Sequence, residues 1–546
     1  MNPGERQPEG ALRMRRKRLI ATAAIVVGIN LILCGCEKES DAALAGSPPA
    51  PDDRPALRIA TIDNYFAANS YKDDLPVWRE VEKRTGVKIV WEVLPREQFG
   101  DGMRLRLSKD TDLPDIFYIP DNDPVKLAGK GTILPLDELI SANAPNIAGF
   151  LREHPDIDKK LRLADGKLYA LASVVTGVAY TDPYGLMLRK DWLDRLGLRE
   201  PATLDEWYAV LKAFKENDPN GNGLRDEIPL LPDIGLKGLK LFGSAVGGHF
   251  FYSDGFYPDA GGNVKYEWLS PEAKELVEWW RKLYSEGLLA SDFLTKTADS
   301  FLSEVAGGRV GALNGFLNLR PKYESGNRQA GDSRAEWVMT VPPGGAGRSG
   351  FYEIYGPVSS WFGISRSSPN PELAIRWLDF IYASEEGSRL VNFGVEGLSY
   401  TMADGRPQFT EYAARNPDGL DLTRLLRSLG AMPTLPWIRA DKGPLSLQPQ
   451  AMLDSDPVGA AQAAKVRPYL IGAIQLALPT PEEKDTEELY GAPLRAYVET
   501  TLARYITGAE EIDWDRFGRT VASLGLDRVL QAKQRQYDRY RGAPSP

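Results

Sequence analysis

A run of oxygen-bearing side chains at regular spacing occupies residues 217–229, NDPNGNGLRDEIP. Hard cations such as Ca²⁺ take about six to eight oxygen ligands, and a loop supplies them when alternate residues point inward. The candidate ligands are Asp218, Asn220, Asn222, the backbone carbonyl of Leu224, Asp226 and Glu227. The motif D-x-[DN]-x-[DN]-G is matched, although the Glu of its last position is absent. The pattern predicts a structural Ca²⁺ site, and the alternative is a metal-free turn, because Gly, Asn and Asp are common in turns.

The composition argues against several other kinds of site. Two His residues among 546 give little material for zinc, haem or Ser-His-Asp chemistry. Six basic and two acidic side chains precede Cys36, so the net charge without that segment would be −13 instead of −9. Such an acidic protein repels the phosphate backbone, which disfavours a nucleic-acid partner. The length itself indicates two or more domains.

The N-terminus has the pattern of an export signal. RMRRKR (13–18) precedes an apolar stretch of 15 residues (19–33), which is short for a membrane-spanning helix. LCGC (33–36) resembles the bacterial lipobox, and in lipoproteins of that pattern the cysteine, here Cys36, is acylated and becomes the first residue of the mature chain. We therefore expect a signal peptide at 1–36 and a flexible tether at 37–56, with an uncleaved N-terminal anchor as the alternative.

The chain after the tether alternates between strand and helix patterns. LRIATID (57–63) and KIVWEVLP (88–95) are short apolar strands, and a helical pattern lies between them at 74–87. A further helix and strand follow, ending at LPDIFYI. This order predicts an α/β domain with a largely parallel sheet.

An ordered set of segments is similar to the bacterial extracellular solute-binding proteins of family 1, the lipid-anchored receptors of sugar ABC importers. The set includes RTGVKIVWEV, LPDIFYI, KGTILPLDELI, DGKLYAL, LMLRKDWLDRLGL and PELAIRWLDFIY. The resemblance covers nearly all of the mature chain and extends to the oligosaccharide-binding branch, alginate-binding members included, in which a Ca²⁺ loop ends in an early Asp-Glu pair. It implies a type II periplasmic-binding-protein-like fold, in which two α/β lobes are joined by hinge segments.

That fold implies three passages of the chain between the lobes. We place the first near 179–190, the second near 355–365 and the third after 397–402. The first lobe would then contain 57–180 and 356–410, and the second would contain 181–355 and 411–546 with the calcium loop at 218–227.

Sugars are held by aromatic rings that stack on pyranose faces and by planar polar groups that bind hydroxyls. We expect such residues in loops punctuated by Gly, Pro or Asn, and the alternative for each is ordinary loop packing. The candidates are Asn64, Tyr65, Trp268, Phe316, Tyr355, Trp361, Trp437 and Arg439. Arg439, Arg189 or Lys190 would matter for an acidic sugar, because a buried carboxylate needs a paired cation.

The resemblance implies a monomeric, extracytoplasmic receptor, anchored to the cell membrane by its lipid, that closes over an oligosaccharide and delivers it to ABC permease subunits. The chain has no G-x-x-x-x-G-K-[ST] motif, so ATP hydrolysis would belong to another subunit. We expect no enzymatic activity. The alternatives are a secreted polysaccharide-degrading enzyme, a receptor that presents its ligand to a sensor kinase, and a peptide-binding protein of the same architecture.

Overall fold

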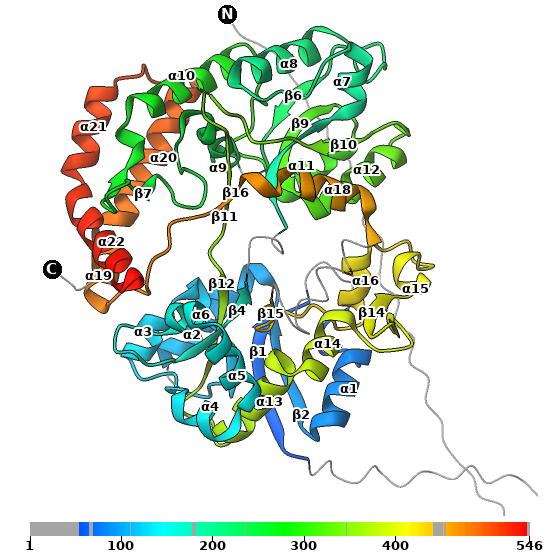
Figure 1. Cartoon of the computed structure of the whole chain (residues 1–546), viewed down its shortest axis with the longest axis vertical. Coiled ribbons are helices and arrows are strands. Elements are labelled where there is room, and N and C mark those ends of the chain that lie inside the picture. The colour runs from blue at the N-terminus through cyan, green and yellow to red at the C-terminus, as the bar shows by residue number, and fades with distance from the viewer. Residues whose placement is uncertain are drawn as a thin grey trace, which may run out of the picture. The chain divides into compact units, whose positions relative to one another are not determined.

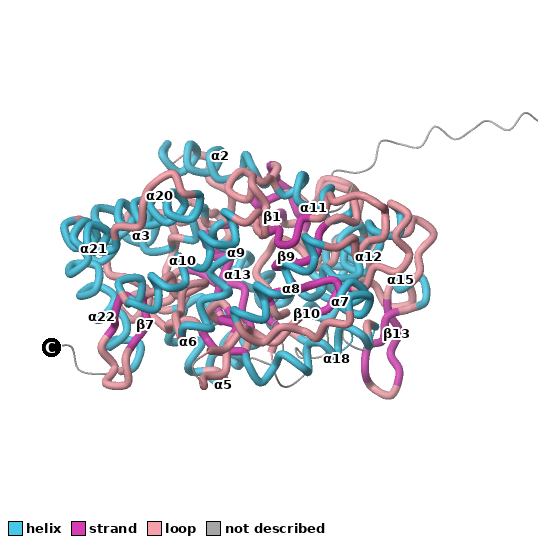
Figure 2. The backbone as a smooth tube through the Cα atoms, turned by 90° about the horizontal axis from the view of Figure 1, so that it is seen from above, coloured by secondary structure: helices cyan, strands magenta, loops and turns pink. Residues whose placement is uncertain are grey.

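Two sheets with separate hydrophobic cores organise the chain (Figure 1). The computed structural model describes residues 54–64, 69–109, 111–176, 182–233, 235–345, 347–440, 451 and 455–542, and residues from Arg54 onward form one compact unit. Helices surround the strands of the two larger sheets, and the β13–β14 hairpin projects at the edge (Figure 2). Cys36 and Tyr65 lie outside the described residues.

The first lobe is built on a six-stranded sheet of order β15-β4-β12-β3-β1-β2. Its elements before the first passage are β1 (Ala56–Ile62), α1 (Pro76–Thr85), β2 (Lys88–Leu94), α2 (Arg96–Lys109), β3 (Ile116–Tyr118), α3 (Pro124–Gly129), α4 (Asp137–Asn143), α5 (Pro145–Glu153), α6 (Pro155–Leu161) and β4 (Ala170–Val175). The returning chain adds β12 (Val358–Ile364), α13 (Pro371–Ala383), α14 (Glu385–Phe393), β13 (Tyr400–Ala403), β14 (Arg406–Phe409), α15 (Glu411–Ala414), α16 (Leu422–Ser428) and β15 (Ile438–Arg439).

The second lobe is built on a four-stranded sheet of order β10-β5-β9-β6. Its elements up to the second passage are β5 (Tyr184–Arg189), α7 (Lys190–Leu196), α8 (Leu204–Glu216), β6 (Ile228–Leu231), α9 (Leu236–Leu239), β7 (Phe256–Pro258), β8 (Val264–Tyr266), α10 (Pro271–Ser285), α11 (Ala298–Ala306), β9 (Val310–Phe316), α12 (Arg320–Gln329), β10 (Trp337–Met339) and β11 (Tyr352–Ile354). The C-terminal elements are α18 (Pro457–Val466), β16 (Leu470–Gly472), α19 (Pro481–Thr486), α20 (Ala492–Thr507), α21 (Trp514–Ser523) and α22 (Leu526–Arg541).

The direction of β12 follows from the path of the chain between the lobes. β4 ends at Val175, where the chain leaves the first lobe, and β12 begins at Val358, where the chain returns. A strand that starts where its neighbour ends must run the opposite way, and β12 is antiparallel to both β4 and β3. The β1–β2, β1–β3 and β15–β4 pairs are parallel, so the sheet is largely parallel with one reversed strand.

The third passage lies later in the chain than the sequence indicated. Leu426, Ala431, Leu435 and Ile438 are buried in the first core, and β15 pairs with β4. Residues 411–440 therefore belong to the first lobe and not to the second, and the chain leaves that lobe after Ala440. The apolar side chains of 422–440 decide this, because they bury their surface against the first sheet.

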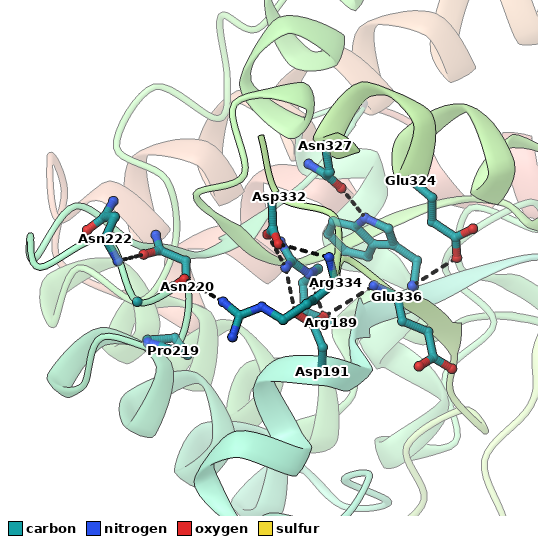
Figure 3. Close-up of polar contacts among 12 residues, drawn as sticks. Arg189, Asp191, Pro219, Asn220, Asn222, Glu324, Asn327, Asp332, Arg334 and Glu336 are labelled. Atoms are coloured by element: carbon teal, nitrogen blue, oxygen red, sulfur yellow. Dashed lines mark hydrogen bonds and ion pairs between the residues drawn. The ribbon is translucent and has the colours of Figure 1, made fainter. Parts of the chain in front are cut away.

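A fully buried guanidinium holds the outer edge of the second sheet together. Arg189, at the end of β5, has a side chain with 0% exposure and donates to Asp191 at 2.7 Å and to Asp332 at 2.5 Å. Its Cζ atom lies 5.0 Å from the centroid of the Trp192 ring. Figure 3 shows Arg189 between the two carboxylates. Arg189 is therefore unavailable to a sugar, contrary to one of the alternatives above.

Replacement of Arg189 by Gln should destabilise the protein strongly, because it leaves two partly buried carboxylates without their cation. We expect a loss of about 3 kcal/mol in the free energy of unfolding, measured by urea denaturation. The matched control is Lys190→Gln, which removes a cation of 35% side-chain exposure from its pair with Asp194, itself 60% exposed. That change should cost less than about 1 kcal/mol. Equal losses in the two variants would contradict the assignment.

Candidate functional site

The loop at 218–227 connects α8 to β6 and is organised by the carboxylate of Asp218. Asp218 accepts backbone N–H groups from Gly221 at 2.7 Å, Asn222 at 3.1 Å and Gly223 at 2.8 Å. The glycines have φ angles of 76° and 79°, values that other residues seldom adopt. The N–H of Gly223, with the other two, lowers the pKa of Asp218, so its carboxylate remains charged.

Glu227, at the end of the same loop, has no hydrogen-bond partner. Both of its carboxylate oxygens are buried, and the nearby N–H groups of Asp226 and Glu227 do not reach hydrogen-bonding geometry. Burial, together with the charges of Asp218 and Asp226, raises the pKa of Glu227. A buried carboxylate beside two others is an environment that a bound cation would stabilise.

The remaining candidate ligands are engaged within the loop. Asn220 Oδ1 accepts the N–H of Asn222 at 2.9 Å, and Asn222 Nδ2 donates to Asp226 Oδ1 at 3.0 Å. The side chain of Leu224 is exposed, so a metal could use only its carbonyl. Within the described ranges, no group of three or more His, Cys, Asp or Glu side chains lies close enough together to hold a metal ion. A cation would therefore also need the amide and backbone oxygens of the loop.

Two arginines support this loop from outside. Arg195 Nη1 donates to the carbonyl of Pro219 at 2.9 Å, and Arg334 Nη2 donates to the carbonyl of Asn220 at 3.3 Å (Figure 3). The N–H of Arg334 also donates to Asp332, which binds Arg189. The loop is thus fixed to the buried ion pairs of the second sheet.

A second group of polar side chains lies where the chain passes between the lobes. Asp182 precedes β5, Tyr355 lies between β11 and β12, and Arg439 ends β15. Asp182 accepts the N–H of Asn318 at 3.2 Å. The Arg439 Cζ atom lies 4.5 Å from the centroid of the Trp437 ring. The charges of Asp182 and Arg439 act on each other and on the phenol of Tyr355.

Burial controls the ionisation of this group. It raises the pKa of Asp182 to about 7, although the Asn318 N–H and Arg439 oppose the shift. Burial also lowers the pKa of Arg439, and Tyr355 and Asp182 oppose that shift. Near neutral pH, Asp182 therefore exchanges a proton while Arg439 keeps its charge.

Aromatic rings continue from these polar groups into the second lobe. The Tyr355 ring lies 6.0 Å from Tyr252, which lies 4.5 Å from Phe251. Phe251 stacks on Tyr184 at 5.0 Å, and Tyr184 contacts Phe316 edge-on at 4.8 Å. We call Phe316, Tyr184, Phe251, Tyr252 and Tyr355 the aromatic wall; Tyr184 and Phe251, each 5% exposed, form its buried backing, and the other three rings are partly exposed. Stacking on sugar rings requires such flat surfaces beside hydrogen-bonding groups.

The carboxylate of Glu353 fixes the loop that carries part of this wall. Glu353 is 3% exposed and accepts the N–H of Phe251 at 2.8 Å, of Tyr252 at 3.1 Å and of Ser253 at 3.3 Å. It also accepts the Ser253 hydroxyl. Burial raises the pKa of Glu353, and these donors oppose the shift. Because Glu353 is on β11, loop 251–253 is held to the strand that leads into the second passage.

Four of the ligand-binding residues expected from the sequence therefore lie on one continuous set of contacts: Phe316, Tyr355, Trp437 and Arg439. Asn64 is 5% exposed and donates to the carbonyl of Arg427 at 2.8 Å, so its amide nitrogen is used by the protein. Tyr65 lies outside the described residues.

Two expected ligand-binding residues are core residues instead. Trp268 is 0% exposed and stacks on Phe250 at 4.0 Å. Trp361 is 4% exposed in the first core, because the register of β12 shifts between Ser359 and Trp361 and turns the indole inward.

The sequence reasoning missed Asp182, Tyr184, Tyr252 and Glu353. Asp182 and Tyr184 lie inside the segment expected to be the first passage, so its topology could have identified them. Tyr252 ends a run of three aromatic residues, FFY, which is separated from the Gly247-Gly248 pair by one histidine. No sequence pattern identifies Glu353, because its carboxylate binds backbone N–H groups that lie about a hundred residues earlier in the chain.

Among the described residues, no helix has the length and apolar character needed to cross a membrane.

Comparisons with known proteins agree with this architecture. FusA of Streptococcus pneumoniae serotype 4, a fructooligosaccharide ABC transporter substrate-binding protein, is 25% identical over 563 residues, which cover 96% of this chain and 99% of FusA. Lipoprotein LipO of Bacillus subtilis strain 168 is 26% identical over 419 residues, which cover 72% of this chain and 75% of LipO. The crystal structure of the alginate-binding protein AlgQ2 without calcium ion has a TM-score of 0.70 at 25% identity, covering 89% of this chain and 98% of AlgQ2.

The family model of bacterial extracellular solute-binding proteins matches residues 62–387, which is more than half of the chain. This match and the AlgQ2 likeness confirm the resemblance and the two-lobed fold class that the sequence predicted. Members of the family are substrate-binding proteins rather than enzymes. This chain belongs to the family of bacterial extracellular solute-binding proteins.

Proposed function

We propose that this protein binds an oligosaccharide between its two lobes, outside the cytoplasm, and delivers it unchanged to the permease of an ABC importer. The aromatic wall beside Asp182 and Arg439 is the observation that carries this proposal. Flat rings and half-buried hydrogen-bonding groups meet there, at the passages between the lobes. FusA, a relative along nearly the whole chain, is a substrate-binding protein of a fructooligosaccharide ABC transporter.

We further propose that the protein is attached to the membrane by acylation of Cys36. The LCGC sequence at 33–36 supports this, and the relative LipO is named a lipoprotein. Residues 37–56 would then serve as the tether between the lipid and β1.

Ca²⁺ is the cation we propose for the loop at 218–227. It prefers oxygen ligands, and Asp218, Asp226 and Glu227 provide three carboxylates besides the amide oxygens of Asn220 and Asn222 and the carbonyl of Leu224. Glu227 supports this choice, because its buried oxygens have no other partner. The ion would stabilise the loop and take no part in binding sugar.

Binding of an oligosaccharide should raise the melting temperature of the purified protein. A ligand at a hundredfold excess over Kd adds about 2.7 kcal/mol of stability, which corresponds to several degrees. A thermal-shift screen of neutral and acidic oligosaccharides measures this, and mass spectrometry of the recovered glycan tests whether it is unchanged. Shortened glycan or new reducing ends would show an enzyme and contradict the proposal.

Acylation of Cys36 should be visible in the protein produced in a bacterium that processes lipoproteins. The mature N-terminal peptide should begin at Cys36 and carry the mass of the added lipid, and Cys36→Ala should release the protein from the membrane fraction. Cys34→Ala is the matched control and should leave the protein in that fraction. An unmodified N-terminus at Met1 would contradict the assignment.

Replacement of Glu227 by Gln should have opposite effects with and without Ca²⁺. With Ca²⁺ the variant should melt at a lower temperature than the unchanged protein, because a ligand is lost. With a chelator it should melt at a higher temperature, because a buried carboxylate without a partner is removed. Thermal unfolding in both conditions measures the effect.

The control for that experiment is Asp259→Asn. Asp259 accepts the N–H groups of Gly261 and Asn263 at 2.9 Å each, a local geometry like that of Asp218 in a different loop. This variant should keep the full response to Ca²⁺. A melting temperature of Glu227→Gln that is independent of Ca²⁺ would exclude the metal from the loop.

A further inference from the structure

The charged group of Arg439 has no hydrogen-bond or ion-pair partner among the described residues. Its backbone is fixed, since β15 pairs with β4 and the Thr176 N–H donates to the Arg439 carbonyl at 2.9 Å. Its guanidinium lies over the Trp437 ring, and no hydrogen bond or ion pair joins it to any described residue. The Nε atom is buried without an acceptor. Because a guanidinium over a ring still has N–H groups at its edge, Arg439 is oriented to bind a planar acceptor.

Two buried arginines elsewhere in the chain, unlike Arg439, have carboxylate partners. Arg189 donates to Asp191 and Asp332, and Arg320 donates to Glu324 at 2.8 Å and to Asp456 at 2.7 Å. Each of these guanidinium groups is thus held by two carboxylates, as expected for a cation removed from water. The isolation of Arg439 therefore indicates that its partner is a ligand.

The carboxylates around the aromatic wall are already bound by the protein. Asp233 binds the Tyr184 hydroxyl and the Asn314 amide, and Glu353 accepts donors from loop 251–253. Asp182 accepts the Asn318 N–H and forms no ion pair with Arg439 in the described structure. Because Asp182 takes up a proton near neutral pH, its carboxylate neutralises even less of the Arg439 charge.

A second cation lies beside the middle of the aromatic wall. Lys237 is on α9, and its Nζ atom lies 5.1 Å from the Phe251 ring centroid and 5.2 Å from the Tyr252 ring centroid. It forms no ion pair with any residue in the described part of the chain. Among the described residues, cations without an ion-pair partner therefore lie beside the Tyr355 end and the middle of the wall, in a protein whose net charge is negative.

We propose that the ligand is an acidic oligosaccharide, with the carboxylate of one sugar unit bound by Arg439 while the aromatic wall contacts the sugar rings. This inference rests on the proposed function and narrows it to glycans that bear a carboxylate. A carboxylate matches the two parallel N–H groups at the edge of a guanidinium. Removing an ionised sugar from water without such a cation would be unfavourable.

The test compares acidic glycans with the same glycans after their carboxyl groups are reduced. Oligogalacturonates from pectin and oligouronates from alginate are titrated by calorimetry, alongside their carboxyl-reduced forms and neutral fructo- and malto-oligosaccharides of equal length. We expect an acidic glycan to bind more tightly than its reduced form. Arg439→Gln should weaken the acidic glycan at least about tenfold and change binding of the reduced form much less.

Two further variants keep the result interpretable. Arg366→Gln removes an exposed arginine that donates to the Gly131 carbonyl, beyond the end of β12 farthest from the passage, and should leave selectivity unchanged. Asp182→Asn removes a carboxylate whose charge acts on Arg439 and should raise the ratio of the affinity for the acidic glycan to that for its reduced form. Melting temperatures of all variants establish that they are folded.

The outcomes separate this inference from the proposed function. Tighter binding of a neutral oligosaccharide than of every acidic glycan would overturn the inference and leave the proposed function standing. If Arg439→Gln lost affinity for the acidic glycan and for its reduced form by the same factor, that result would also overturn the inference. Failure of all the glycans to bind would overturn both.

Discussion

The contact between the Glu353 carboxylate and the backbone of loop 251–253 is the interaction on which the position of the aromatic wall depends. Three consecutive N–H groups are buried there, and the carboxylate accepts all of them. Without it they would be unsatisfied donors in a water-poor site, which costs more than the hydrogen bonds themselves contribute. Tyr355 follows Glu353 by two residues, and Tyr252 lies in the bound loop, so one carboxylate sets the position of two neighbouring rings of the wall. The wall therefore stays with the second lobe when the passages bend.

The buried arginines of the second lobe have carboxylate partners, whereas Arg439, beside the aromatic wall, does not have them among the described residues. Arg189 and Arg320 are each held between two carboxylates, and these ion pairs join β5, α12 and the segment before α18 into one lobe. Arg439 is half-buried beside an aromatic ring and lacks such partners. Buried ion pairs are a poor source of net stability but fix the relative positions of the segments that they join. Arg439, a cation that no described residue pairs, does the opposite, because its charge stays available to a ligand from solution.

The sequence predicted the family and the fold class, and its failures have local physical causes. Phe316, Tyr355, Trp437 and Arg439 stay predictions for ligand binding, and two of them end strands rather than lying in loops: Phe316 ends β9 and Arg439 ends β15. The sequence could not show whether Trp268 faces the core or the ligand, because a loop pattern does not show which way a ring points. In the structure the Trp268 ring packs against Phe250 and Trp280. Trp361 is reversed by an irregularity in β12, where Ser360 has a φ angle of 54° and the alternation of inward and outward residues changes. The third passage was misplaced because β15 contains only two residues, too few to give a strand pattern.

The loop at 218–227 and the aromatic wall are connected through a single strand, β5. Tyr184 at its start contacts Phe251 and Phe316, and Arg189 at its end binds Asp332, whose neighbour Arg334 supports the loop. β5 is paired with β9 on one side and β10 on the other, and the structure shows a single arrangement of this strand. Coupling between distant sites requires an element with two arrangements that both sites influence. A cation in the loop would therefore act by stabilising the second sheet, whose strands β5 and β9 carry Tyr184 and Phe316.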